Sequence, residues 1–126
     1  MRKYLFLLLT LFISGCPTGD RFNLYQVKSK IVDGKVCVFF NESDIVKNES
    51  ILNIAIWKQG GDTYVYEKSY VYSPITLEAN KCVPGIGEFN FIAGDGYTVL
   101  VRTPLNSYRS SFVVWKKGES IILRPD

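Results

Sequence analysis

The 126-residue sequence predicts an all-β fold, an immunoglobulin-like β-sandwich of about seven or eight short strands. Short runs rich in β-branched and aromatic residues recur at a spacing of roughly ten residues, and turn-forming residues separate them. No segment beyond the N-terminal fifteen residues has the period of an amphipathic helix. Because a single sheet would leave one apolar face in water, we expect two layers.

The first two strands are expected to form a hairpin. "LYQVKSKIV" at 24–32 alternates loosely, and "KVCVFF" at 35–40 follows it directly after Asp33 and Gly34. An Asp-Gly pair between two such runs is the strongest short-range hairpin signal, because both residues tolerate the left-handed backbone conformation. The polar stretch that follows, 41–50, predicts a loop or a short helical turn.

The middle of the chain predicts two longer strands. "ILNIAIWK" at 51–58 has the composition of a buried strand, and "TYVYEKSYVY" at 63–72 follows it after a Gly-Gly-Asp turn. Pro74 then interrupts strand pairing. The chain continues to Cys82, bends at a Pro-Gly sequence and enters "EFNFIA" at 88–93.

The last third of the chain predicts three strands. "YTVLVR" at 97–102 is a strong strand signal, and "RSSFVVWK" at 109–116 and "ESIILR" at 119–124 predict a final hairpin around a Lys-Gly turn. Alternation places one set of side chains of the first of these strands on a common face: Tyr97, Val99 and Val101.

The N-terminus has the layout of an export signal. Two basic residues, Arg2 and Lys3, precede an apolar run at 4–13. The run is too short to span a membrane, since about 20 apolar residues are needed. The run ends in "ISGC" at 13–16, which resembles the lipobox of bacterial lipoproteins. That resemblance implies cleavage after Gly15 and acylation, including palmitate, at Cys16; a plain signal peptide with an unrelated cysteine is the alternative.

The lipobox divides the chain into three parts. These are a signal peptide at 1–15, a lipidated N-terminus with a short tether at 16–23, and a β-sandwich domain at 24–126. Several acyl chains on one cysteine hold a protein stably on a membrane surface without spanning the membrane. Pro17 follows the cysteine where aspartate would favour the inner membrane, so we expect an envelope lipoprotein at the outer membrane, facing the periplasm.

Composition argues against several classes of function. Removing 15 residues from 126 leaves 111, and losing two basic residues with them leaves 13 basic against 12 acidic side chains, a net charge of +1. Such a balance gives no reason to expect nucleic acid as a partner. The chain has no histidine, and its acidic residues are scattered singly through turn-like stretches. We therefore expect no enzyme activity, no metal, no small-molecule substrate and no cofactor besides the covalent lipid.

Two cysteines remain once Cys16 is assigned to the lipid. Cys37 and Cys82 lie 45 positions apart, and an even remainder in an exported chain predicts a disulfide. We expect the bridge to join strands or loops on the two sides of the sandwich. Closing a loop of this length contributes about 4 kcal/mol to stability. The alternative is a pair of free, buried thiols.

A run of alternating tyrosines is a candidate partner-binding surface. On an unbroken strand, period two would place all four on one face: Tyr64, Tyr66, Tyr70 and Tyr72. They form either an exposed aromatic platform for a protein or glycan partner or ordinary cross-strand pairs on a half-buried sheet. A second candidate patch is the turn at 106–109 together with Trp115, although Trp115 itself is expected in the core.

Four stretches together resemble a known family. They are "SGCPTGDR" (14–21), "DGKVCVFF" (33–40), "NKCVPGIG" (80–87) and "GDGYTVLVR" (94–102). The arrangement is similar to type VI secretion immunity lipoproteins of enterobacteria, which have a GCPG-like start, a V-C-V strand, a C-x-P segment and a late G-x-x-Y-x-V strand. This chain departs from the pattern at Thr18, where the family has glycine.

The resemblance implies a protective binding role. Such a protein binds a toxic effector protein in the periplasm and neutralises it, and this needs a stable scaffold and a complementary surface but no chemistry. Two alternatives remain. One is a periplasmic lipoprotein inhibitor of a lysozyme-like enzyme, for which an acidic surface patch would be expected. The other is a structural or assembly lipoprotein of the envelope, which an exposed, unpaired edge strand would favour.

Overall fold

A computed structural model describes residues 24–44 and 49–125, which form ten strands and two short 3-10 helices. The predicted all-β fold is confirmed. The predicted signal peptide, the tether and the lipidated Cys16 lie outside the described residues. Within the described part of the chain, no helix is long and apolar enough to cross a membrane.

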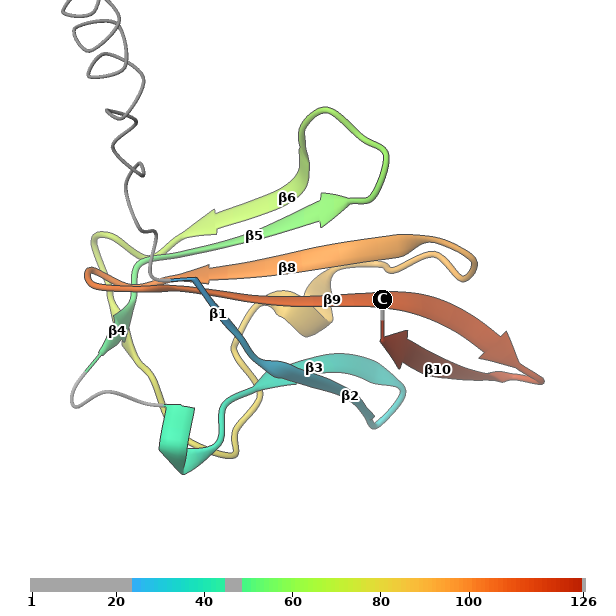
Figure 1. Ribbon diagram of the computed structural model, residues 1–126, viewed down its shortest axis with the longest axis horizontal. Coiled ribbons are helices and arrows are strands. Elements are labelled where there is room, and N and C mark those ends of the chain that lie inside the picture. Colours follow the sequence, from blue (N-terminus) through green and yellow to red (C-terminus); the bar gives the residue numbers. More distant parts are fainter. Residues whose placement is uncertain (1–23, 45–48, 126) are drawn as a thin grey trace, which may run out of the picture.

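The elements follow one another along the chain with short connections in most places (Figure 1). They are β1 (Leu24–Gln26), β2 (Lys28–Val32), β3 (Lys35–Phe39), η1 (Glu42–Asp44), β4 (Ser50–Ile51), β5 (Asn53–Lys58), β6 (Tyr64–Ser69), β7 (Ile75–Thr76), η2 (Ile86–Glu88), β8 (Gly96–Arg102), β9 (Ser107–Lys117) and β10 (Ser120–Pro125). The structure has more strands than the predicted seven or eight. The difference comes from very short strands, since β1, β4 and β7 have only two or three residues each.

The larger sheet has six strands. Its order is β1-β9-β8-β5-β6, and β10 pairs with β9 on the same edge as β1 (Figure 1). The hairpins β5-β6 and β8-β9 join through the antiparallel β5-β8 pair. This is the order of the G, F, C and C′ strands in a variable-type immunoglobulin sheet, which agrees with the predicted immunoglobulin-like sandwich.

The second layer is built from the β2-β3 hairpin and the long connection between β7 and β8. The hairpin turns at Asp33 and Gly34, with φ of 52° and 75°, as the Asp-Gly signal predicts. The connection runs beside β3, since the Asn80 amide donates to the Phe40 carbonyl at 2.7 Å and the Val83 amide donates to the Val38 carbonyl at 2.8 Å.

The predicted disulfide between Cys37 and Cys82 is formed, with a Cα–Cα distance of 5.1 Å. It does not join the two sides of the sandwich as expected. Both cysteines belong to the second layer, because the segment that carries Cys82 lies alongside β3. The bridge therefore fixes the irregular connection to a regular strand.

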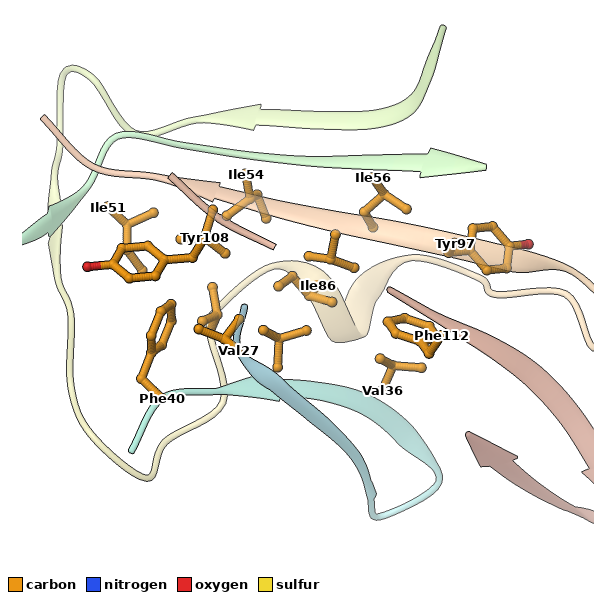
Figure 2. Packing of buried hydrophobic residues seen from close by; sticks show 14 of the residues in the cluster. Val27, Val36, Phe40, Ile51, Ile54, Ile56, Ile86, Tyr97, Tyr108 and Phe112 are labelled. Carbon is orange, nitrogen blue, oxygen red and sulfur yellow. The ribbon is translucent and has the colours of Figure 1, made fainter. Parts of the chain in front are cut away.

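The core lies between the two layers (Figure 2). Tyr97, Val99 and Val101 share one face of β8, as predicted, and this face points into the core, since each residue is at most 1% exposed. They pack in one cluster with buried residues from both layers: Val27, Val36, Val38, Phe40, Ile51, Ile54, Ile56, Leu77, Val83, Ile86, Tyr108, Phe112 and Val114.

Aromatic side chains cover the core near the start of β8. "EFNFIA" at 88–93 is not a strand; it begins with the last residue of η2 and continues as irregular chain. This segment instead supplies Phe91, whose ring lies edge-on to Tyr97 at 4.9 Å between centroids and 5.6 Å from Phe112. Burial of its aromatic rings, without ladder pairing, accounts for the apolar character of this stretch.

Gly85, which precedes η2, occupies a position that no other residue suits. Its φ is 87°, and a Cβ there would lie 2.8 Å from the Tyr70 hydroxyl and 2.9 Å from Cδ1 of buried Ile54. We expect Gly85→Ala to lower the free energy of unfolding by about 2–3 kcal/mol. Gly94 also has a positive φ, 96°, but open space around it. Gly94→Ala should cost only about 1 kcal/mol. Urea titration of the two variants measures both losses, and equal losses would contradict the packing argument.

Candidate binding surface

The larger sheet has one buried face and one face that reaches solvent. Along β9, Tyr108, Ser110, Phe112 and Val114 are buried, while the residues between them are exposed or half-buried. The same alternation holds along β8. Cross-strand partners in the sheet share a face, so the register defines an outer face that carries Trp57, Tyr64, Thr98, Arg102, Arg109, Ser111, Trp115 and Arg124.

Three side chains form an ordered cluster on the outer face, here called the arginine–aromatic cluster. Arg102 donates from Nη2 to the Tyr64 hydroxyl at 2.8 Å, and its guanidinium lies 5.9 Å from the Tyr64 ring centre. The Tyr64 ring in turn lies edge-on to Trp57, with centroids 5.4 Å apart. Hydrogen bonding and ring contact hold the arginine in place before any partner arrives.

A second arginine–aromatic pair lies at the other edge of the same face. The Arg124 guanidinium is 5.6 Å from the Trp115 ring centre. Trp115 is 44% exposed, so its predicted place in the core is wrong. The reason is the alternation of β9: Val114 points inward and is fully buried, so its neighbour must point outward.

A groove of about 810 Å³ opens where the edge partner of β9 changes from β1 to β10. Three of its fifteen lining residues are cationic, namely Lys28, Arg109 and Arg124, and none of the fifteen is acidic. Hydroxyl groups line it as well, among them Thr98 and Ser111, which hydrogen-bond to each other at 2.8 Å. The remaining lining residues are Gln26, Val27, Ser29, Phe39, Trp57, Gln59, Gly60, Ser110, Phe112 and Leu123.

The four predicted tyrosines do not share a face. Ile56 pairs with Tyr66 but Trp57 pairs with Tyr64, so Val65 forms a β-bulge that turns Tyr64 to the outer face. Tyr66 and Tyr70 instead pack against the core. Tyr72 lies beyond the end of β6 and is 99% exposed. Only Tyr64 therefore joins the candidate surface.

The inner side of β6 carries a small polar group. The Lys68 ammonium lies 5.5 Å from the Tyr70 ring centre and 3.8 Å from the Glu88 carboxylate. The nearby Tyr70 hydroxyl and Glu88 carboxylate raise the pKa of Lys68 above its usual value. This lysine is therefore engaged by its neighbours and lies apart from the outer face.

The turn at 106–109, the other predicted patch, divides between two roles. Arg109 reaches the groove, but Asn106 turns inward and donates from Nδ2 to Glu49 at 2.6 Å. Glu49 is only 3% exposed and also accepts hydrogen bonds from the Thr103 hydroxyl, at 2.8 Å, and from Tyr108. Burial and the bond to Glu49 raise the pKa of Tyr108 well above its usual range. These contacts tie the start of β4 to the β8-β9 turn.

Among the cationic residues of the surface, Arg109 lies in a predicted patch, but Arg102, Arg124 and Lys28 were not predicted. Arg102 is the last residue of β8, and Arg124 lies next to the last residue of β10. Strand alternation could have placed both on the outer face, opposite the residues that point into the core. Lys28 could not be placed without the tertiary structure, because it approaches the groove from the second layer. Among the described residues, no three acidic or cysteine side chains lie together as a metal site would require.

Comparison with known proteins places the chain in a family. A search of curated proteins gave no significant match. The family described as a domain of unknown function (DUF7480) matches residues 24–117. This match covers β1 to β9, and with them the arginine–aromatic cluster and most of the groove. Because it spans well over half of the sequence, the chain belongs to the DUF7480 family of domains of unknown function.

Proposed function

We propose that this protein is a lipid-anchored periplasmic immunity protein that binds a toxic effector delivered by type VI secretion and neutralises it. The export signal and lipobox-like "ISGC" support the compartment, and the four family-like stretches support the role. The structural observation that carries the proposal is the arginine–aromatic cluster on the outer face of the larger sheet.

This cluster has the composition and order that a protein-binding surface needs. Tryptophan, tyrosine and arginine are the residues that most often dominate interface energies. The hydrogen bond between Arg102 and Tyr64 restricts the arginine before binding, so less side-chain entropy is lost when a partner docks. A sheet that packs on the core lies behind the cluster and keeps these groups in register.

The positive charge of the groove argues against the alternative that this protein inhibits a lysozyme-like enzyme. A basic, lysozyme-like enzyme would have to approach a groove that holds Lys28, Arg109 and Arg124 without a single acidic lining residue. Like charges at an interface cost binding energy. An effector with an acidic face is the better electrostatic match.

The open edge of the larger sheet argues against the alternative of a structural or assembly lipoprotein of the envelope. In the described part of the chain β6 pairs with β5 alone, so it is an open edge of the kind that assembly would use. However, β6 carries exposed Glu67 and Lys68 and the bulge at Val65. Charged side chains and bulges are the features by which edge strands avoid pairing with other chains.

A competition assay tests the proposal. A strain lacking this gene is grown in contact with its parent, with the parent's type VI apparatus intact or disabled. We expect the mutant to be lost only beside the armed parent and to be rescued by a copy of residues 1–126. A Trp57→Ala/Arg102→Ala copy should fail to rescue at equal protein level, while the matched control Lys81→Gln should rescue fully. Equal survival of the mutant while the apparatus fires would contradict the proposal.

The same strains test the anchor. Grown with labelled palmitate, the wild-type copy should incorporate label and Cys16→Ser should not. Label on Cys16→Ser would contradict acylation at Cys16.

A further inference from the structure

We infer that the groove between β1 and β10 binds an acidic, extended polypeptide segment of the partner. This inference rests on the proposed binding function and specifies the partner's chemistry. It concerns Lys28, Arg109 and Arg124, which line the groove from three different strands.

The groove concentrates positive charge that no salt bridge among the described residues neutralises. The salt bridges of the described residues join Lys58 to Asp95, Lys68 to Glu88 and Lys81 to Glu78, and none involves a groove cation. Arg124 contacts the Trp115 ring, which carries no negative charge. Three cations without an acidic neighbour in the lining favour an anionic ligand, since arginine–carboxylate pairs are strong and directional.

The shape of the groove favours an extended chain. β1 pairs with β9 as far as Arg109, and β10 pairs with β9 from Phe112 onward. Among the described residues, Ser110 and Ser111 between them have no strand partner on that edge, and both line the groove. An extended segment that crosses this two-residue gap could hydrogen-bond to the β9 backbone there, as in recognition by strand addition. The volume of about 810 Å³ is that of a small-ligand or peptide site.

The cation spacing suggests how the carboxylates are arranged. Arg124 pairs with Val113, which is four residues beyond Arg109 on β9. Four residues of a strand span about 13 Å, and residues four apart point to the same face. Two acidic side chains at positions i and i+4 of an extended segment would therefore match Arg109 and Arg124. A nucleic-acid or polyphosphate chain would instead need a continuous cationic track.

Synthetic peptides provide a direct probe. The first is acetyl-Thr-Glu-Val-Thr-Val-Glu-Thr-amide, and its control replaces both glutamates by glutamine. With the purified protein in isothermal titration calorimetry, we expect the glutamate peptide to bind at least about tenfold more tightly in low salt. The difference should disappear in Arg109→Gln/Arg124→Gln and persist in Lys81→Gln. Equal affinity for the two peptides, or no glutamate-dependent binding at millimolar peptide, would overturn the inference, as would tighter binding of a polyphosphate than of the glutamate peptide.

A genetic experiment distinguishes failure of this inference from failure of the proposed function. In the competition assay, an Arg109→Glu/Arg124→Glu copy is compared with the wild-type copy and with Lys81→Gln at equal protein level. Loss of protection only in the charge-reversed copy supports the acidic partner. Full protection by that copy overturns the inference and leaves the immunity function standing. Failure of the wild-type copy to protect overturns the immunity function itself, while the peptide titration still decides whether the groove selects acidic segments.

Discussion

Replacing Cys37 and Cys82 together by serine should lower the free energy of unfolding by about 4 kcal/mol. The bridge closes a loop of 45 residues, and opening it restores that freedom to the unfolded chain. A domain of this size has a total stability of about 5–15 kcal/mol, so the loss is a large part of the whole. The segment from β7 to η2, which has little regular structure, would lose its covalent attachment to β3.

Urea titration with and without a reducing agent measures this effect. The matched control is Cys16→Ser, which removes a cysteine but keeps the bridge and should leave the unfolding midpoint unchanged. The double variant should unfold at much lower urea, and reduction should shift the wild-type protein to the same midpoint. A difference below about 1 kcal/mol would mean that the folded domain does not depend on the bridge.

Local chemistry predicts much of this fold. The Asp33-Gly34 pair specifies a two-residue hairpin without reference to the rest of the chain. Alternation in 97–102 identifies the buried side of β8, because a half-buried strand needs one apolar face. The prediction of the bridge comes from a count, because Cys37 and Cys82 remain once Cys16 is assigned to a lipid. Each of these features depends on residues close in sequence or on a count.

Features that depend on tertiary structure were not predictable in the same way. The bulge at Val65 divides the tyrosines between two faces, and no residue type in "TYVYEK" signals it. The groove exists because β1 and β10 share one edge of β9, which requires strands from the two ends of the domain to meet there. The outer-face arginines become a site only once β6, β8 and β10 are assembled in one sheet.

The buried polar network around Glu49 is the strongest case of this kind. Position 49 lies in a polar stretch that predicts a loop or a short helical turn, yet its side chain is buried. It contacts Thr103, Asn106 and Tyr108, which are more than fifty positions away. A carboxylate is an acceptor-only group, so it suits three converging donors. Buried polar networks of this type help to specify one arrangement of a loop.

Removing the carboxylate should therefore be costly. Glu49→Ala leaves the Thr103 hydroxyl, the Asn106 amide and the Tyr108 hydroxyl without this acceptor in a buried site, and we expect a loss of about 3 kcal/mol in the free energy of unfolding. Glu78→Ala is the matched control. Glu78 forms an exposed pair with Lys81, and its loss should cost less than about 0.5 kcal/mol. Similar losses for the two variants would mean that Glu49 is not a structural anchor.

Because Tyr108 is titratable, the stability that this network contributes depends on pH. A simple packing role would not produce this dependence. Its pKa is raised in the folded protein, so above pH 10 the unfolded chain releases the tyrosine proton while the folded protein keeps it. Stability from this group is therefore fully present below pH 10 and falls as the pH rises above it, by at most about 1.4 kcal/mol per pH unit. Tyr108→Phe should be less stable at pH 8 by about 2 kcal/mol and lack this part of the alkaline decline. Urea titrations from pH 8 to 11 measure both quantities, and parallel pH profiles for the two proteins would contradict the assignment of the raised pKa to Tyr108.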